Sequence, residues 1–147
     1  MRNTIVNAMP LAATLALAGQ LFAGGFFLQV GNPEASAEAR KANAVLTIKA
    51  VGCHDPAAAK VTATAIGLVN GQRRTISLEV KPLSEPGMFA VSQQWPKEGN
   101  WVIELVGKNE QQFTNTLVAA GPVGVNRYKT KSDMKQFTDA DVDAMLK

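Results

Sequence analysis

The only cysteine and the only histidine of the 147-residue chain are neighbours, in the stretch GCHDP at residues 52–56. Cys53, His54 and Asp55 all carry side chains that can bind zinc or copper. Metal sites usually draw ligands from at least two segments, and this is the one evident segment. Thioether ligands for Cu(I) would have to come from distant methionines: Met88, Met134 or Met145. We therefore expect a strand end followed by a turn, with metal binding at Cys53, His54 and Asp55 as the alternative.

Enzymatic chemistry finds no complete set of residues in the chain. Neighbouring residues of a strand point to opposite faces, so His54 would not reach Cys53 as a base, and there is no second histidine. The acidic residues at 139, 141 and 143 suggest calcium, but the glycine and the distal glutamate of an EF-hand loop are missing. We predict a non-enzymatic protein with no catalytic residues and no cofactor.

The basic residues of the chain are spread over its length, and the net charge is +3. Local concentrations occur at Arg73-Arg74 and at residues 127–135, and neither is interleaved with a row of aromatic residues. Such clusters are typical of a solvated surface, so we expect no nucleic-acid partner.

A long segment without any charge lies between Arg2 and Glu34 and is mostly apolar. Ala35-Ser36-Ala37 follows it with the small residues that signal peptidase requires. The sequence therefore predicts a signal peptide over residues 1–37, cleavage near Ala37, and an extracytoplasmic domain, periplasmic or secreted. The alternative is an uncleaved N-terminal anchor, because the apolar run is long enough to span a bilayer. We expect membrane contact only in that case.

After a predicted flexible leader at residues 38–43, the hydrophobic pattern changes to a period of two, which is typical of half-buried strands. Six segments show this period: 44–51, 60–69, 73–80, 88–95, 101–106 and 111–120. A seventh short strand is expected within residues 121–128. Turn residues separate these segments roughly every ten residues, as in an all-β sandwich. We predict an immunoglobulin-like antiparallel β-sandwich over residues 44–125.

The dipeptide Asn70-Gly71 predicts a two-residue β-hairpin, because both positions tolerate the positive φ of a type I′ turn. With these two residues in the loop, paired positions sum to 70 + 71 = 141. That register places three apolar pairs on one face: Val61 with Val80, Ala63 with Leu78, and Ala65 with Ile76. A shift by one residue would set the same row against polar side chains, so the turn and the hydrophobic pattern agree.

Residues 126–147 are predicted to form a charged loop and a short C-terminal helix. Thr138 and Asp141 have the spacing of a capping box, and Phe137 with Val142 has that of a hydrophobic staple. The helix would carry one apolar stripe for packing onto the sandwich or onto a partner: Val142, Met145 and Leu146.

The segment GMFAVSQQWPKEGNWVIEL at residues 87–105 resembles the last hairpin of bacterial extracytoplasmic immunoglobulin-like domains of the YtkA-like and FixH-like kind. The matching positions are Gly87, Phe89, Pro96, Gly99 and Trp101. The resemblance implies a small binding or accessory module, and some such domains are linked to copper handling or to oxidase assembly. The chain lacks the methionine- and histidine-rich motif of copper-binding members.

Two functions follow from these observations. The first is an exported, non-enzymatic binding or accessory module for an unknown protein or small ligand. The alternative is an extracytoplasmic copper-handling domain centred on Cys53 and His54. A metal site requires cysteine, histidine and methionine side chains to cluster, whereas a binding module requires an exposed surface suited to a partner.

Overall fold

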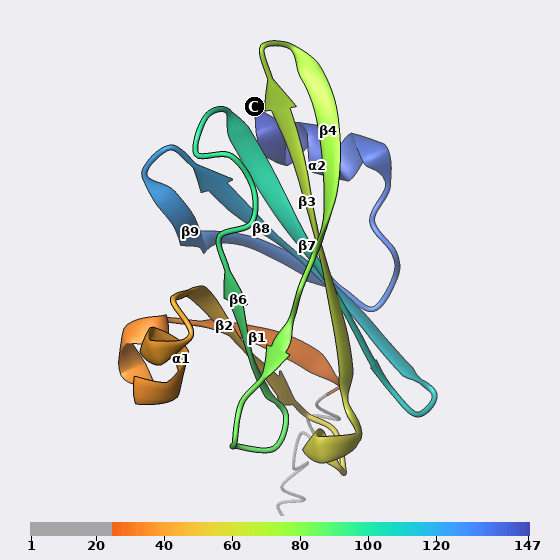
Figure 1. Cartoon of the computed structure of the whole chain (residues 1–147). Helices are drawn as coiled ribbons and strands as arrows, with labels where there is room; N and C mark the ends of the chain where they lie inside the picture. The colour runs from red at the N-terminus through yellow and green to blue at the C-terminus, as the bar shows by residue number, and fades with distance from the viewer. Residues whose placement is uncertain (1–24) are drawn as a thin grey trace, which may run out of the picture.

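The computed structural model describes residues 25–147, which form two antiparallel β-sheets with helical segments at their margins (Figure 1). Sheet A has four strands, in the spatial order β1 (Phe27–Gly31), β2 (Ala44–Val51), β6 (Met88–Ser92) and β5 (Lys81–Pro82). Sheet B has five, in the order β4 (Gln72–Leu78), β3 (Lys60–Val69), β7 (Asn100–Asn109), β8 (Gln112–Gly121) and β9 (Gly124–Asp133). The helical segments are η1 (Pro33–Ala35), α1 (Ala37–Lys41), η2 (Pro56–Ala58) and α2 (Asp139–Leu146).

The strand order is that of an immunoglobulin-like sandwich. Sheet A follows the A-B-E-D order of that fold, and β3, β7 and β8 take the places of its C, F and G strands. The chain passes from sheet B to sheet A between β4 and β5 (Figure 1). The predicted all-β sandwich with a C-terminal helix is confirmed, with nine strands in the described residues rather than six or seven. No helix within residues 25–147 is long and apolar enough to cross a membrane.

The hydrophobic core lies between the sheets and follows the predicted alternation. Its central residues come from β2 and β7 and are at most 2% exposed: Leu46, Ile48, Ala50, Trp101, Ile103 and Leu105. The indole nitrogen of Trp101 donates a hydrogen bond of 2.8 Å to the carbonyl of Glu98. The largest buried ring therefore adds apolar area to the core without leaving its polar atom unpaired.

The hairpin of β3 and β4 has the predicted register. Asn70 and Gly71 both have positive φ, 51° and 76°, as a type I′ turn requires. Two of the three predicted pairs are present: Ala63 with Leu78 and Ala65 with Ile76. The third pair, Val61 with Val80, lies beyond the ladder because β4 ends at Leu78. On its other side, β3 pairs with β7 along its length, with Val61 opposite Gly107.

The sandwich begins earlier than the predicted boundary at residue 44. Strand β1 lies inside the segment that we assigned to the signal peptide, and it pairs with β2 over five residues. Phe26 and Leu28 are each 2% exposed in the core, whereas Phe27 and Gln29 point outward. The alternation of a strand was concealed because β1 directly follows another apolar segment. The remainder of the predicted signal or anchor, residues 1–24, lies outside the described residues.

Two further segments differ from their predictions. The leader at 38–43 is not an irregular chain, because Ala37–Lys41 form α1 and Ala39 is fully buried. The predicted charged loop after residue 125 is mostly β9, which pairs with β8 along the edge of sheet B. The basic residues of β9 had concealed the strand, since a solvated edge strand needs no alternation of apolar residues.

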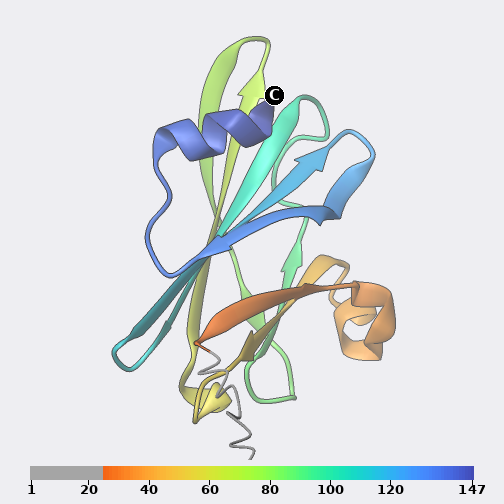
Figure 2. The same ribbon diagram turned by 180° about the vertical axis from the view of Figure 1, so that it is seen from behind.

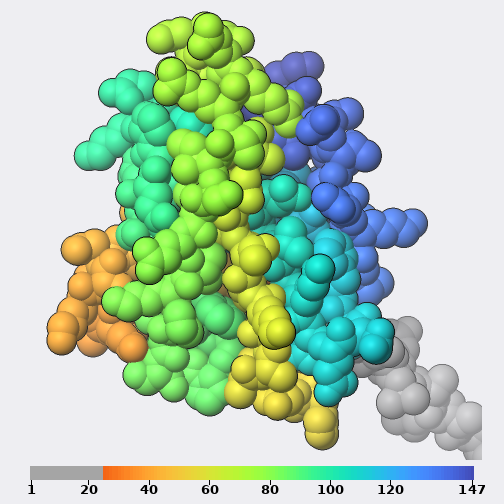
Figure 3. Space-filling view, turned by 45° about the vertical axis from the view of Figure 1, so that its right-hand side comes forward, coloured from red at the N-terminus to blue at the C-terminus, as the bar shows by residue number. Residues whose placement is uncertain are grey.

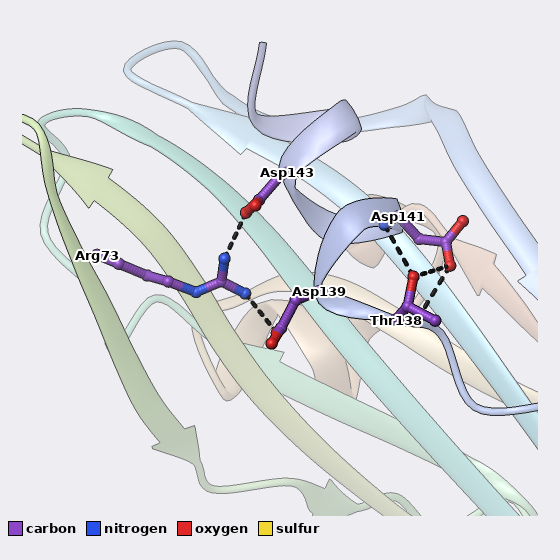
Figure 4. Close-up of polar contacts among 5 residues, drawn as sticks. All are labelled: Arg73, Thr138, Asp139, Asp141 and Asp143. Atoms are coloured by element: carbon purple, nitrogen blue, oxygen red, sulfur yellow. Dashed lines mark hydrogen bonds and ion pairs between the residues drawn. The ribbon is translucent and has the colours of Figure 1, made fainter.

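The predicted C-terminal helix is confirmed as α2, which covers part of the outer face of sheet B (Figure 2). Thr138 and Asp141 form the capping box (Figure 4). Phe137 packs against the cluster that contains Val142. This second core joins α2 to strands β3, β7 and β8 of sheet B. Its buried residues are Ile66, Val102 and Leu117 from the strands and Val142 and Leu146 from α2. Hydrogen bonds hold the pKa of the Asp141 carboxyl well below its ordinary value. The largest contribution comes from Lys131, and the next comes from Thr138.

Candidate functional site

The GCHDP stretch forms the end of β2 and the turn after it. The strand ends at Val51, and Gly52 takes a φ of 73° that redirects the chain. Asp55 then caps η2, because its carboxylate accepts a hydrogen bond of 3.0 Å from the amide of Ala57. The side chain of Cys53 is half-buried against the main core, and that of His54 is exposed.

The candidate metal ligands Cys53, His54 and Asp55 lie near one another only because they are adjacent in the sequence. Within residues 25–147 there is no group of three or more histidine, cysteine, aspartate or glutamate side chains that could hold a metal ion. Met88 lies on the outer face of sheet A, whereas Met145 packs in the α2 cluster on sheet B. Met134 is exposed beside Gly25. The three methionines are thus distributed over different parts of the molecule.

A cleft lies on the outer face of sheet A, and none of the GCHDP residues lines it. It encloses about 370 Å³ between the η1–α1 segment and residues 83–88, which are the connection from β5 to β6 and the first residue of β6. Strands β1, β2 and β6 contribute its floor: Gln29, Gly31, Thr47, Lys49 and Met88. Thr47 is 4% exposed although its strand face points away from the core, because the η1–α1 segment covers it.

Local sequence explains why residues 32–41 form the wall of this cleft. Asn32 caps η1 by accepting a hydrogen bond from the amide of Glu34, and Pro33 begins that helical turn with its ring buried. The hydroxyl of Ser36 then accepts one of 3.1 Å from the amide of Ala39 and starts α1. These two caps fold the connection between β1 and β2 into a compact wall rather than an extended loop.

A polar contact ties α1 to the opposite wall. The carboxylate of Glu38 accepts hydrogen bonds from both the amide and the hydroxyl of Ser84, at 3.0 and 3.1 Å. In Figure 3 the orange α1 segment lies beside the green segment that contains Ser84. Glu38 and Leu83 also line a second cavity of about 310 Å³ that adjoins the cleft. The second cavity shares Ala42 and Lys81 with a third, of about 170 Å³.

We refer to these three adjoining cavities together as the α1 groove. Its charged side chains are of both signs rather than forming a patch of one sign. Lys49 and Glu85 form an ion pair of 2.8 Å in the first cavity, and Lys41 and Lys81 line the second beside Glu38. The Lys49 and Glu85 side chains are 46% and 58% exposed, so water screens the pair and a ligand can replace it at little cost.

Comparison of the chain with protein-family models, with curated proteins and with solved structures finds no match. The resemblance of residues 87–105 to YtkA-like and FixH-like domains therefore stays a prediction from the sequence. The assignment of a function has to rest on the geometry of the described residues.

Sequence reasoning missed the α1 groove because its wall, residues 32–41, was divided between the predicted signal peptide, which ended at residue 37, and the predicted flexible leader at 38–43. A local signal was present. Ser36 is followed by a short run of good helix formers, with an acidic residue early and basic residues late, which is the pattern of a capped helix. The run has five residues, and helices this short depend on tertiary packing for their stability.

Proposed function

We propose that the chain is an exported, non-enzymatic binding module whose α1 groove holds an extended polar segment of a partner protein. The observation that carries the proposal is the row of three neighbouring cavities. Successive cavities share lining residues over the outer face of sheet A beside α1. A row of neighbouring cavities suits an elongated ligand better than a compact one.

The lining of the groove favours a polar peptide over an apolar ligand. Carboxylates and ammonium groups both line it, and the larger apolar side chains among its lining residues are Leu83 and Met88. A peptide backbone presents donors and acceptors in alternation, so it can pair with both signs of charge and with the amides and hydroxyls of the first cavity. An apolar ligand would remove water from the exposed charged side chains without replacing its hydrogen bonds, which is costly.

Export is the second part of the proposal. It rests on the uncharged apolar segment that follows Arg2 and on the resemblance to extracytoplasmic domains. A domain with one cysteine cannot form an internal disulfide, so its stability outside the cytoplasm would depend on the two apolar clusters.

The test is a binding screen with charge-reversal variants. The purified domain is applied to an array of random polar hexapeptides, and the affinity of the retained peptides is measured by calorimetry. We expect Lys49→Glu and Lys81→Glu to weaken retained peptides about tenfold or more, a loss of about 1.4 kcal/mol. Lys108→Glu is the matched control, because it makes the same charge change at an exposed position of β7 outside the groove.

Two results would contradict the proposal. One is an array on which no peptide is retained. The other is a set of retained peptides that bind the Lys49→Glu variant as well as they bind the Lys108→Glu control. Thermal melts of each variant establish that the domain is folded at the assay temperature, so a loss of binding cannot be attributed to unfolding.

A further inference from the structure

Strand β1 limits where the chain can be cut during export. Its five residues pair with β2 from Phe27 opposite Val51 to Gly31 opposite Thr47. Phe26 and Leu28 fill the main core, and Val30 packs against it. A domain that lacked these residues would have a water-filled gap in its core and an uncovered edge on β2. Residues 26–31 therefore belong to the folded domain.

The A-x-A site at residues 35–37 is part of the folded structure as well. Ala35 ends η1, and Ser36 caps α1 through its hydroxyl. Cleavage after Ala37 would remove β1, η1 and the cap of α1 together. Ser36 has a structural role that does not involve a peptidase, because its hydroxyl accepts a hydrogen bond from the amide of Ala39 and starts α1.

We propose that the export signal is cut within residues 18–25, with the bond after Ala18 as the principal site. The proposal rests on the export proposed above. Ala16-Leu17-Ala18 is an A-x-A site with leucine at the middle position, where large residues are accepted, and it lies within the uncharged apolar segment that follows Arg2. Cleavage there leaves β1 complete.

The test is the mass of the exported protein. The full chain is expressed in a bacterial host, fractions are separated, and intact mass gives the first residue of the chain outside the cytoplasm. We expect Gly19, and any first residue from 19 to 26 supports the proposal because β1 is retained. Ala18→Leu should then block or displace cleavage, since position −1 requires a small residue. Ala37→Leu should leave cleavage unchanged, and Ala37 is exposed on α1.

The opposing results are distinct from one another. Glu38 as the first residue of the folded, exported protein would overturn the processing site and leave the export proposal intact. A full-length chain in the membrane fraction would overturn the processing site in favour of an anchor. A full-length chain confined to the cytoplasm would overturn both the processing site and export.

Discussion

The docking of α2 onto sheet B depends on apolar packing more than on ion pairs, and mutation can separate the two contributions. Arg73 donates hydrogen bonds to Asp139, at 2.8 Å, and to Asp143 (Figure 4). The two aspartate side chains are 91% and 52% exposed, so both pairs are screened by water. Val142 and Leu146, in contrast, are each 3% exposed.

The magnitudes follow from these exposures. An exposed ion pair contributes about 0.2–1 kcal/mol, so Arg73→Gln should weaken docking by about 0.5–1 kcal/mol in total. A buried leucine truncated to alanine costs about 2–5 kcal/mol, and Leu146 should fall near the lower value because it is the last residue of α2, where a helix frays. Since about 1.4 kcal/mol is a factor of ten, the population with α2 detached should rise about 2- to 5-fold for Arg73→Gln. It should rise about 30-fold for Leu146→Ala.

Hydrogen exchange of the amides of residues 139–146 measures this population directly. The effect of Arg73→Gln should shrink in 1 M salt, and that of Leu146→Ala should not. Lowering the pH gives a related check. Because the pKa of Asp141 is depressed in the folded state, its stabilising contribution is complete above the unfolded pKa and is lost progressively as the pH falls from there through the folded pKa. A larger effect for Arg73→Gln than for Leu146→Ala, or equal salt sensitivity of both, would refute this account of docking.

Three other predictions concern the core, a turn and the metal alternative. Leu28→Ala should lower the free energy of unfolding by about 2–5 kcal/mol in urea denaturation. Gln29→Ala, on the outer face of β1, should lower it by less than about 0.5 kcal/mol. Equal effects would show that β1 is not part of the core. Gly71→Val should cost about 1–2 kcal/mol because its φ is 76°, and an unchanged urea midpoint would count against the type I′ turn. Titration with Cu(I), Cu(II) or Zn(II) should leave the melting temperature unchanged, since a metal that binds the folded state must raise it. Stoichiometric binding that is lost in Cys53→Ala or His54→Ala would instead establish the copper-handling alternative.

The parts of the fold that the sequence predicts correctly are those decided by neighbouring residues. The alternation in β2 and the turn at Asn70-Gly71 are local, and so is the capping box of Thr138 and Asp141. The turn and the capping box are completed by residues close in sequence, and the alternation of a strand requires only one buried face. These patterns can therefore be interpreted without knowledge of distant segments. The boundary errors in β4 and β7 are small for the same reason.

The parts that the sequence conceals depend on partners far along the chain. β1 is apolar enough to continue the preceding segment, and only its pairing with β2 shows it to be a strand. The α1 groove is a stronger example, because one wall comes from residues 32–41 and the other from residues 83–88. Neither wall carries a motif, and the contact between Glu38 and Ser84 joins positions that are 46 residues apart.

The processing site and the proposed binding function are connected through β1. Five of the eleven residues that line the first cavity precede residue 38: Gln29, Gly31, Asn32, Ala35 and Ser36. A mature chain that began at Glu38 would lack the strand and the caps that position the wall of the α1 groove. Peptide binding at the groove therefore requires a mature N-terminus before β1, whereas a copper site at Cys53 and His54 has no such requirement. The mass of the exported chain thus bears on which of the two functions the fold can support.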